Sequence, residues 1–186
     1  MAARASLASL ITRVRTLIDD NATTKTFTDD EVQAALDNWR TDVRYLELRP
    51  AETRTSSGVE YRDYYAPCGD WEADAVLYDS GYATLTPTTS EYQAGHWAFT
   101  TGVTPPVYIV GKTFDVYAAA ADLLEMWAAR EKLSFDFDTD GQSFKRSQKA
   151  AALLALAREY RRQQRPARVL MDRGDIRSWY ADYQRD

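Results

Sequence analysis

The sequence predicts a mainly helical α+β fold: a small bundle of about four helices, with an antiparallel β region inserted between the second and third long helices. Two observations predict this fold class. Apolar residues recur with the helical period before residue 47 and again after residue 114. Between these stretches Gly, Pro, Thr and Tyr become frequent and the helical period disappears. We therefore expect a helical core from residues 1–50 and 115–165, a β-rich insertion from residues 51–114, and a C-terminal arm from residues 166–186.

Two helices are expected before residue 50. The first, over residues 6–20, has its apolar side chains at the i, i+3, i+4, i+7 positions of one face. The second begins with a capping box formed by Thr28 and Glu31, and Phe27 and Val32 stand at the positions of a hydrophobic staple. Its apolar positions continue to about residue 46, and Pro50 marks its end.

The middle of the chain is predicted to be β-structure. Short runs rich in β-branched and aromatic residues alternate with turn clusters that contain Gly, Pro, Ser and Thr. The predicted strands are residues 59–65, 75–78, 82–85, 96–100 and 107–114.

Helical periodicity returns at Asp115, a residue type that caps helix N-termini well. Ala-rich and Leu-rich stripes predict one helix to about residue 132 and another over residues 143–164, which Pro166 ends. A short apolar pattern near the C-terminus fits one or two helical turns.

Charge is unevenly distributed along the chain. The net charge is −5, yet residues 142–186 contain eleven Lys and Arg against five Asp and Glu, so the remainder carries the acidic excess. An acidic body opposes general DNA binding, because non-specific affinity comes from neutralising phosphates. A partner protein docked by the basic tail is the favoured interpretation. A single cysteine, Cys68, excludes an intrachain disulfide and fits synthesis in the cytoplasm.

One stretch has the opening of a calcium-binding loop. Asp136, Asp138 and Asp140 alternate before Gly141, as the first ligands of an EF-hand do. The twelfth position, which should supply a bidentate Glu, is Ser147. These aspartates are therefore only a weak metal-site candidate, and an acidic turn before a helix is the favoured interpretation.

No residue set predicts catalysis. His96 lies in a predicted strand without a catalytic motif around it, and Cys68 has no basic neighbour in sequence to lower its pKa. Lys112 follows a glycine as in a phosphate-binding loop, but Pro106 stands where that loop needs its first glycine. We expect no enzyme activity, no bound metal and no cofactor.

Two stretches resemble head–tail adaptor proteins (head-completion or connector proteins) of tailed bacteriophages. The first is residues 10–46, with its two helices and the sequence FTDDE. The second is residues 108–162, in which a strand leads into an Ala-rich helix, an acidic DGQSFKRSQ turn and a basic Ala/Leu helix. The resemblance implies a structural protein of the virion neck, made in the host cytoplasm. It also implies a ring, typically of twelve subunits, that extends the DNA channel below the portal without sequence-specific DNA binding.

The resemblance also implies partners and docking residues. The expected partners are the portal protein and a stopper or tail-completion protein, with no membrane contact. The C-terminal arm is expected to grip the portal, because Arg forms paired bonds to carboxylates and Trp and Tyr are common interface anchors. The predicted docking residues are Arg165, Arg168, Arg173, Arg177, Trp179, Tyr180 and Tyr183.

An alternative from another functional class remains open. The last long helix carries a row of basic residues and would suit a small helical regulator that binds nucleic acid with steep salt dependence. Its candidate contact residues are Lys145, Arg146, Lys149, Arg158, Arg161 and Arg162.

Overall fold

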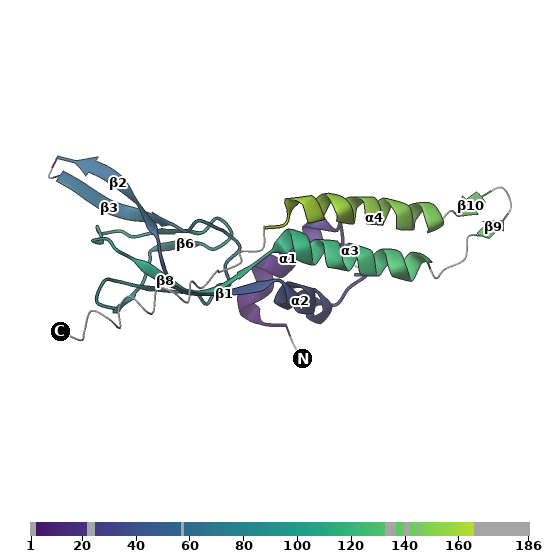
Figure 1. The fold of residues 1–186 in the computed structure, drawn as a ribbon, viewed down its shortest axis with the longest axis horizontal. Coiled ribbons are helices and arrows are strands. Elements are labelled where there is room, and N and C mark those ends of the chain that lie inside the picture. The colour runs from purple at the N-terminus through teal and green to yellow at the C-terminus, as the bar shows by residue number, and fades with distance from the viewer. Residues whose placement is uncertain are drawn as a thin grey trace, which may run out of the picture.

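The computed structural model describes residues 3–21, 25–56, 58–132, 137–139, 142–144 and 146–165. A helical half and a β-rich half lie next to each other along the longest axis (Figure 1). The chain crosses between them more than once, so residues from both ends of the sequence meet at the junction.

Four α-helices build the helical half, and a short 3-10 turn (Ala5–Leu7) precedes the first. They are α1 (Ala8–Leu17), α2 (Asp29–Asn38), α3 (Val116–Lys132) and α4 (Arg146–Gln163). The last two run antiparallel side by side, and α1 and α2 pack against α3 (Figure 1). One apolar core joins all four helices, and α3 contributes most to it through its buried alanines and leucines.

Two four-stranded antiparallel sheets build the β-rich half. The first has the order β1-β8-β4-β5 and contains β1 (Arg40–Glu47), β8 (Tyr108–Phe114), β4 (Val76–Tyr78) and β5 (Thr84–Leu85). The second has the order β2-β3-β7-β6 and contains β2 (Arg49–Thr55), β3 (Gly58–Tyr65), β7 (His96–Ala98) and β6 (Thr89–Glu91). Between α3 and α4 in sequence, β9 (Phe137–Thr139) and β10 (Gln142–Phe144) pair antiparallel.

A second apolar core fills the β-rich half, built around the edge-to-face contact between Trp71 and Trp97. Strand β8 joins this core to the helical one. Its Ile109 is buried among the β residues, whereas Phe114 at its end belongs to the helical core. Because β8 leads directly into α3, the two halves share a continuous stretch of backbone.

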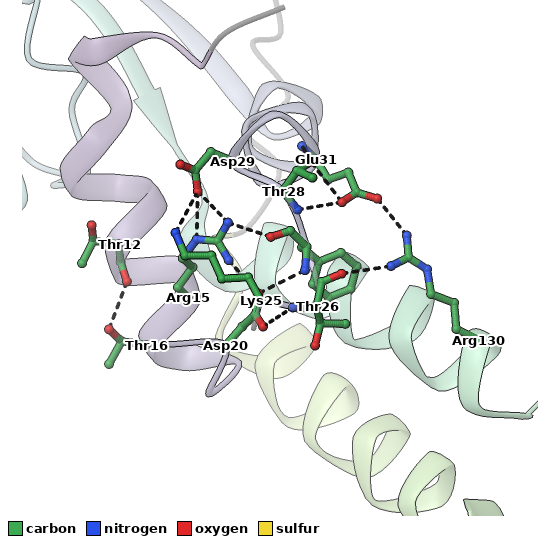
Figure 2. A network of polar contacts seen from close by, with 11 residues as sticks. Thr12, Arg15, Thr16, Asp20, Lys25, Thr26, Thr28, Asp29, Glu31 and Arg130 are labelled. Carbon is green, nitrogen blue, oxygen red and sulfur yellow. Dashed lines mark hydrogen bonds and ion pairs between the residues drawn. The ribbon is translucent and has the colours of Figure 1, made fainter. Parts of the chain in front are cut away.

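The link between α1 and α2 is held by a buried ion network (Figure 2). Arg15 is 4% exposed, and its guanidinium pairs with Asp20 and Asp29, both at 2.6 Å. The same group donates a hydrogen bond of 2.8 Å to the carbonyl of Phe27. The Arg15 guanidinium has five N–H donors in one plane, so a single side chain can bind Asp20, Phe27 and Asp29 together.

The predicted fold class is wrong. The middle of the chain is not a small insertion in a helical bundle, because it forms most of two four-stranded sheets with an apolar core of their own. The expected second helix ends at Asn38, and the residues after it form β1, which pairs antiparallel with β8 from Arg40 opposite Phe114 onward. Trp39 and Val43 fit a helical period, but pairing with a buried strand outweighs that weak local preference.

Strand β2 is absent from the predicted strands, because Pro50 indicates the end of a helix when the sequence is read alone. Proline is tolerated there since β2 is an edge strand whose outward N–H positions need no partner. The expected helix 143–164 begins at Arg146 instead, because the residues before it form β10.

Several local predictions are confirmed. The capping box is present: Thr28 Oγ1 accepts from Glu31 N at 3.2 Å, and Glu31 Oε2 accepts from Thr28 N at 2.8 Å. Asp115 caps α3, accepting hydrogen bonds from the backbone N–H groups of Tyr117 and Ala118. All five predicted strands occur within a few residues of their expected positions, as β3, β4, β5, β7 and β8.

Candidate interaction surfaces

The predicted docking residue Arg165 is engaged within its own chain. Its Nη2 donates to Asp70 Oδ2 at 3.0 Å and to the Gly69 carbonyl at 2.8 Å, and its backbone N donates to Asp115 Oδ2 at 2.6 Å. Asp70 also pairs with Arg13 of α1. Burial raises the pKa of the Asp70 carboxyl, although the two guanidinium groups oppose this. Arg165 therefore fixes the end of α4 to the β-rich half.

The remaining predicted docking residues lie outside the described part of the chain. They are Arg168, Arg173, Arg177, Trp179, Tyr180 and Tyr183. Of the weak metal-site candidates, Asp136 and Asp140 also lie outside it, and Asp138 lies in β9, where only the backbone is described. Among the described residues no three His, Cys, Asp or Glu side chains come together as metal ligands.

The single histidine sits between carboxylates on the second sheet. His96 Nε2 is 2.9 Å from Asp63 Oδ1, its Nδ1 is 3.5 Å from Glu91 Oε2, and its ring stacks on Tyr65. These neighbours lie across adjacent strands, an arrangement that stabilises sheets. His96 thus contacts side chains of both neighbouring strands, β3 and β6.

Glu72 is a buried carboxylate at the junction of the two halves. Its side chain is 1% exposed, and Oε1 accepts from Ser6 Oγ at 2.6 Å and from Arg4 Nε at 3.1 Å. Its Oε2 accepts no hydrogen bond from the described residues but lies 3.3 Å from Lys112 Nζ. Arg4 also pairs with Asp37 of α2 at 2.6 Å. Glu72 thus ties the N-terminal segment to β8.

An open groove of about 490 Å3 lies between α2 and α3. Each helix lines it with residues at i, i+3, i+4 and i+7, which is one face of a helix. The lining residues are Glu31, Ala34, Ala35 and Asn38 from α2, and Asp122, Glu125, Met126 and Ala129 from α3. The groove therefore has an apolar floor and an acidic rim.

The rim carboxylates are held in place by the chain itself. Glu31 accepts from Arg130 Nη2 at 2.8 Å, and its pKa is lowered chiefly by the hydrogen bond from Thr28 N (Figure 2). Asp122 accepts from Trp39 Nε1 at 2.7 Å and pairs with Arg161, which also reaches Glu125 at 3.2 Å. This fixed acidic rim was not predicted, although the i, i+3, i+4, i+7 spacing was visible in the sequence.

The basic side chains of α4 that the structure describes divide into two groups, whereas Lys145 and the side chain of Arg146 lie outside the described part. Lys149 pairs with Glu131 at 2.7 Å and lies over the Trp127 ring, and Arg161 faces the groove rim. Arg158 and Arg162 are exposed. Within the described part of the chain, Arg162 pairs with the exposed Glu159 and Arg158 forms no ion pair. The row of cations proposed to bind nucleic acid is thus partly neutralised within the chain.

Four tyrosines cluster on the first sheet and the turn between β4 and β5; Tyr45 and Tyr82 are exposed, and Tyr78 and Tyr108 are half-buried. Tyr45 contacts Tyr78 and Tyr82 with ring centroids 5.7 and 5.3 Å apart, and Tyr82 stacks on Tyr108. Tyr45 and Tyr82 are 52% and 63% exposed and have φ of 50° and 61°. Left-handed backbone is uncommon for bulky residues. At Tyr45 it lies where the β1–β8 register shifts.

No protein-family model matches the chain, and the comparisons with curated proteins and with solved structures found no significant similarity. Within the described residues, no helix is both long enough and apolar enough to span a bilayer.

Proposed function

We propose that this chain is a head–tail adaptor of a tailed bacteriophage, a non-enzymatic virion subunit. Copies of it form a ring of about twelve subunits beneath the portal, extend the DNA channel, and present a platform for the stopper or tail. One observation carries the proposal. The two segments that resemble adaptor proteins, 60 or so residues apart in sequence, form one unit in which α1 and α2 share a core with α3 and α4, and β1 pairs with β8.

The arrangement of charge supports the same role. A ring needs a heterologous interface, in which one face of each subunit meets a different face of the next. This chain has an acidic groove rim on α2 and α3 and exposed arginines on α4. A DNA channel should not bind the duplex tightly, since each neutralised phosphate adds affinity. An acidic body suits a passage through which DNA slides.

Mixing the purified chain with the portal protein from the same genome tests the proposal. We expect native mass spectrometry and negative-stain images to show an added ring on one end of the portal. Absence of any complex, together with virions that lack the chain between capsid and tail, would contradict it.

A DNA titration separates this proposal from the nucleic-acid regulator. We expect weak binding of duplex DNA by the isolated chain at low salt. A regulator that neutralises several phosphates should instead bind tightly at low salt and lose affinity steeply as salt rises. Replacing Arg158 and Arg162 by Gln should then weaken the binding, while Gln163→Ala serves as the control on the same helix.

A further inference from the structure

We infer that the α2–α3 groove of one copy binds the exposed face of α4 from the next copy, and that this contact closes the ring. The inference rests on the proposed function, because it assigns the two faces of the ring interface. Its occupant is a second copy of this chain.

Charge complementarity identifies the occupant. The residues that line the groove include three carboxylates, Glu31, Asp122 and Glu125, and no basic residue. Arg130 and Arg161 of the same copy pair with these carboxylates from outside the groove. The exposed face of α4 carries two basic residues, Arg158 and Arg162, and one carboxylate, Glu159. Opposite charges on two faces of one molecule attract copies in a head-to-tail sense, whereas like faces repel. Self-association through the groove alone would bring acidic rims together.

The exposed face of α4 also has the chemistry to fill the groove. Alanines lie along its centre, at positions 151, 152 and 155, and all three are exposed. Small residues let another helix approach closely, since interaxial distance depends on the side chains at the contact. Leu156 lies at one edge of the face and is 38% exposed. The groove floor offers it Met126, which is 43% exposed, together with the side chains of Ala34 and Ala129.

The two exposed arginines lie along the other edge of that face. Arg158 and Arg162 are one helical turn apart, so both guanidinium groups can reach one row of carboxylates. Glu125 on the groove rim is 45% exposed at its side chain and is held by Arg161 of its own copy. A partly desolvated ion pair between Arg158 or Arg162 of one copy and Glu125 of the next would fix register and orientation more than it adds affinity. The apolar contacts are expected to supply most of the binding free energy.

Cross-linking between two different variants tests the contact. In a Cys68→Ala background, one preparation carries Ala34→Cys in the groove and the other carries Ala155→Cys on α4. We expect a short bismaleimide to link the chains when both preparations are assembled together on the portal, and not when either is assembled alone. Ser80→Cys, in an exposed turn of the β-rich half, replaces Ala34→Cys as the matched control.

A blocking variant gives an independent measure. Ala34→Arg places a long cation on the groove floor, and we expect ring assembly to weaken about tenfold or more. Ala8→Arg, at an exposed position of α1, makes the same replacement away from the groove and should assemble normally. Unchanged circular dichroism of both variants excludes misfolding as the cause.

The outcomes separate the two claims. Rings that form on the portal without an Ala34–Ala155 cross-link, or that form equally well with Ala34→Arg, overturn the groove contact and leave the adaptor role standing. Equal linking of the Ala34→Cys preparation alone also overturns it, because the contact would then be symmetric. Absence of rings with every variant and with the unaltered chain contradicts the adaptor role itself.

Discussion

Glu72 shows what one buried charge does at the junction between the halves. Replacing Glu72 by Gln keeps the shape but leaves Arg4 and Lys112 facing a neutral group. We expect unfolding free energy to fall by about 2 kcal/mol, less than for a fully buried pair because both cations are about one-third exposed. Urea denaturation measures this.

The matched control for that residue is Asp74→Asn. Asp74 also faces Lys112, at 3.4 Å, but its side chain is 49% exposed. A change within about 0.5 kcal/mol is expected there. Equal effects of the two substitutions would contradict the role of burial at Glu72.

Glu31 predicts a pH dependence at the start of α2. The hydrogen bond from Thr28 N, and then the Arg130 pair, lower its pKa below the usual value of about 4.3. A lowered carboxyl pKa gives stability that is present above the unfolded-state value and is lost as pH falls through the folded-state value. Glu31→Gln keeps the capping box but removes the charge. We expect it to cost about 0.5 kcal/mol near neutral pH and almost nothing at about pH 2, as measured by urea unfolding at both pH values.

At the scale of elements, the β8–α3 connection joins the two cores through Asp115. One carboxylate oxygen caps α3, and the other accepts from Arg165 N at the end of α4. Asp115→Ala should cost about 1–2 kcal/mol from the lost cap. That loss corresponds to a Tm decrease of roughly 3–6 °C for a chain of this size. Asp115→Ser, which keeps a capping oxygen, should recover part of it; a Tm equal to that of the Ala variant would contradict the capping role.

Elements with local signals were predictable from the sequence, and those that depend on distant partners were not. The α2 start and the α3 start have capping residues within four positions, so short-range chemistry determines them. Strand β1 has no such signal. Its formation depends on β8, more than 60 residues later in sequence, so a window around residue 43 fits a helix equally well.

The candidate surfaces also depend on contacts between residues far apart in sequence, so the sequence alone did not predict them. The groove faces of α2 and α3 each have regular spacing, but nothing local indicates that the two faces border one another. The resemblance to adaptor proteins predicts a docking role for Arg165, and nothing in the sequence indicates its contacts within the chain. Its contacts with Asp70 and Gly69 join positions almost 100 residues apart, and only the folded chain reveals them.

At the scale of the whole molecule, Arg165 divides the chain into a folded unit and an arm. Its side chain joins the end of α4 to Gly69 and Asp70 of the β-rich half, and its backbone N–H binds Asp115 at the start of α3, so a chain that ends at Arg165 keeps these links. We expect such a truncation to retain its circular dichroism spectrum and ring contacts but to lose most of its affinity for the portal, measured by co-sedimentation.

A second truncation, ending at Gln163, removes Arg165 as well and should lower the Tm, because Asp70 and Asp115 each lose a donor. If the chain that ends at Arg165 does not fold, the docking role of residues 166–186 is contradicted, because the arm would then be needed for the fold.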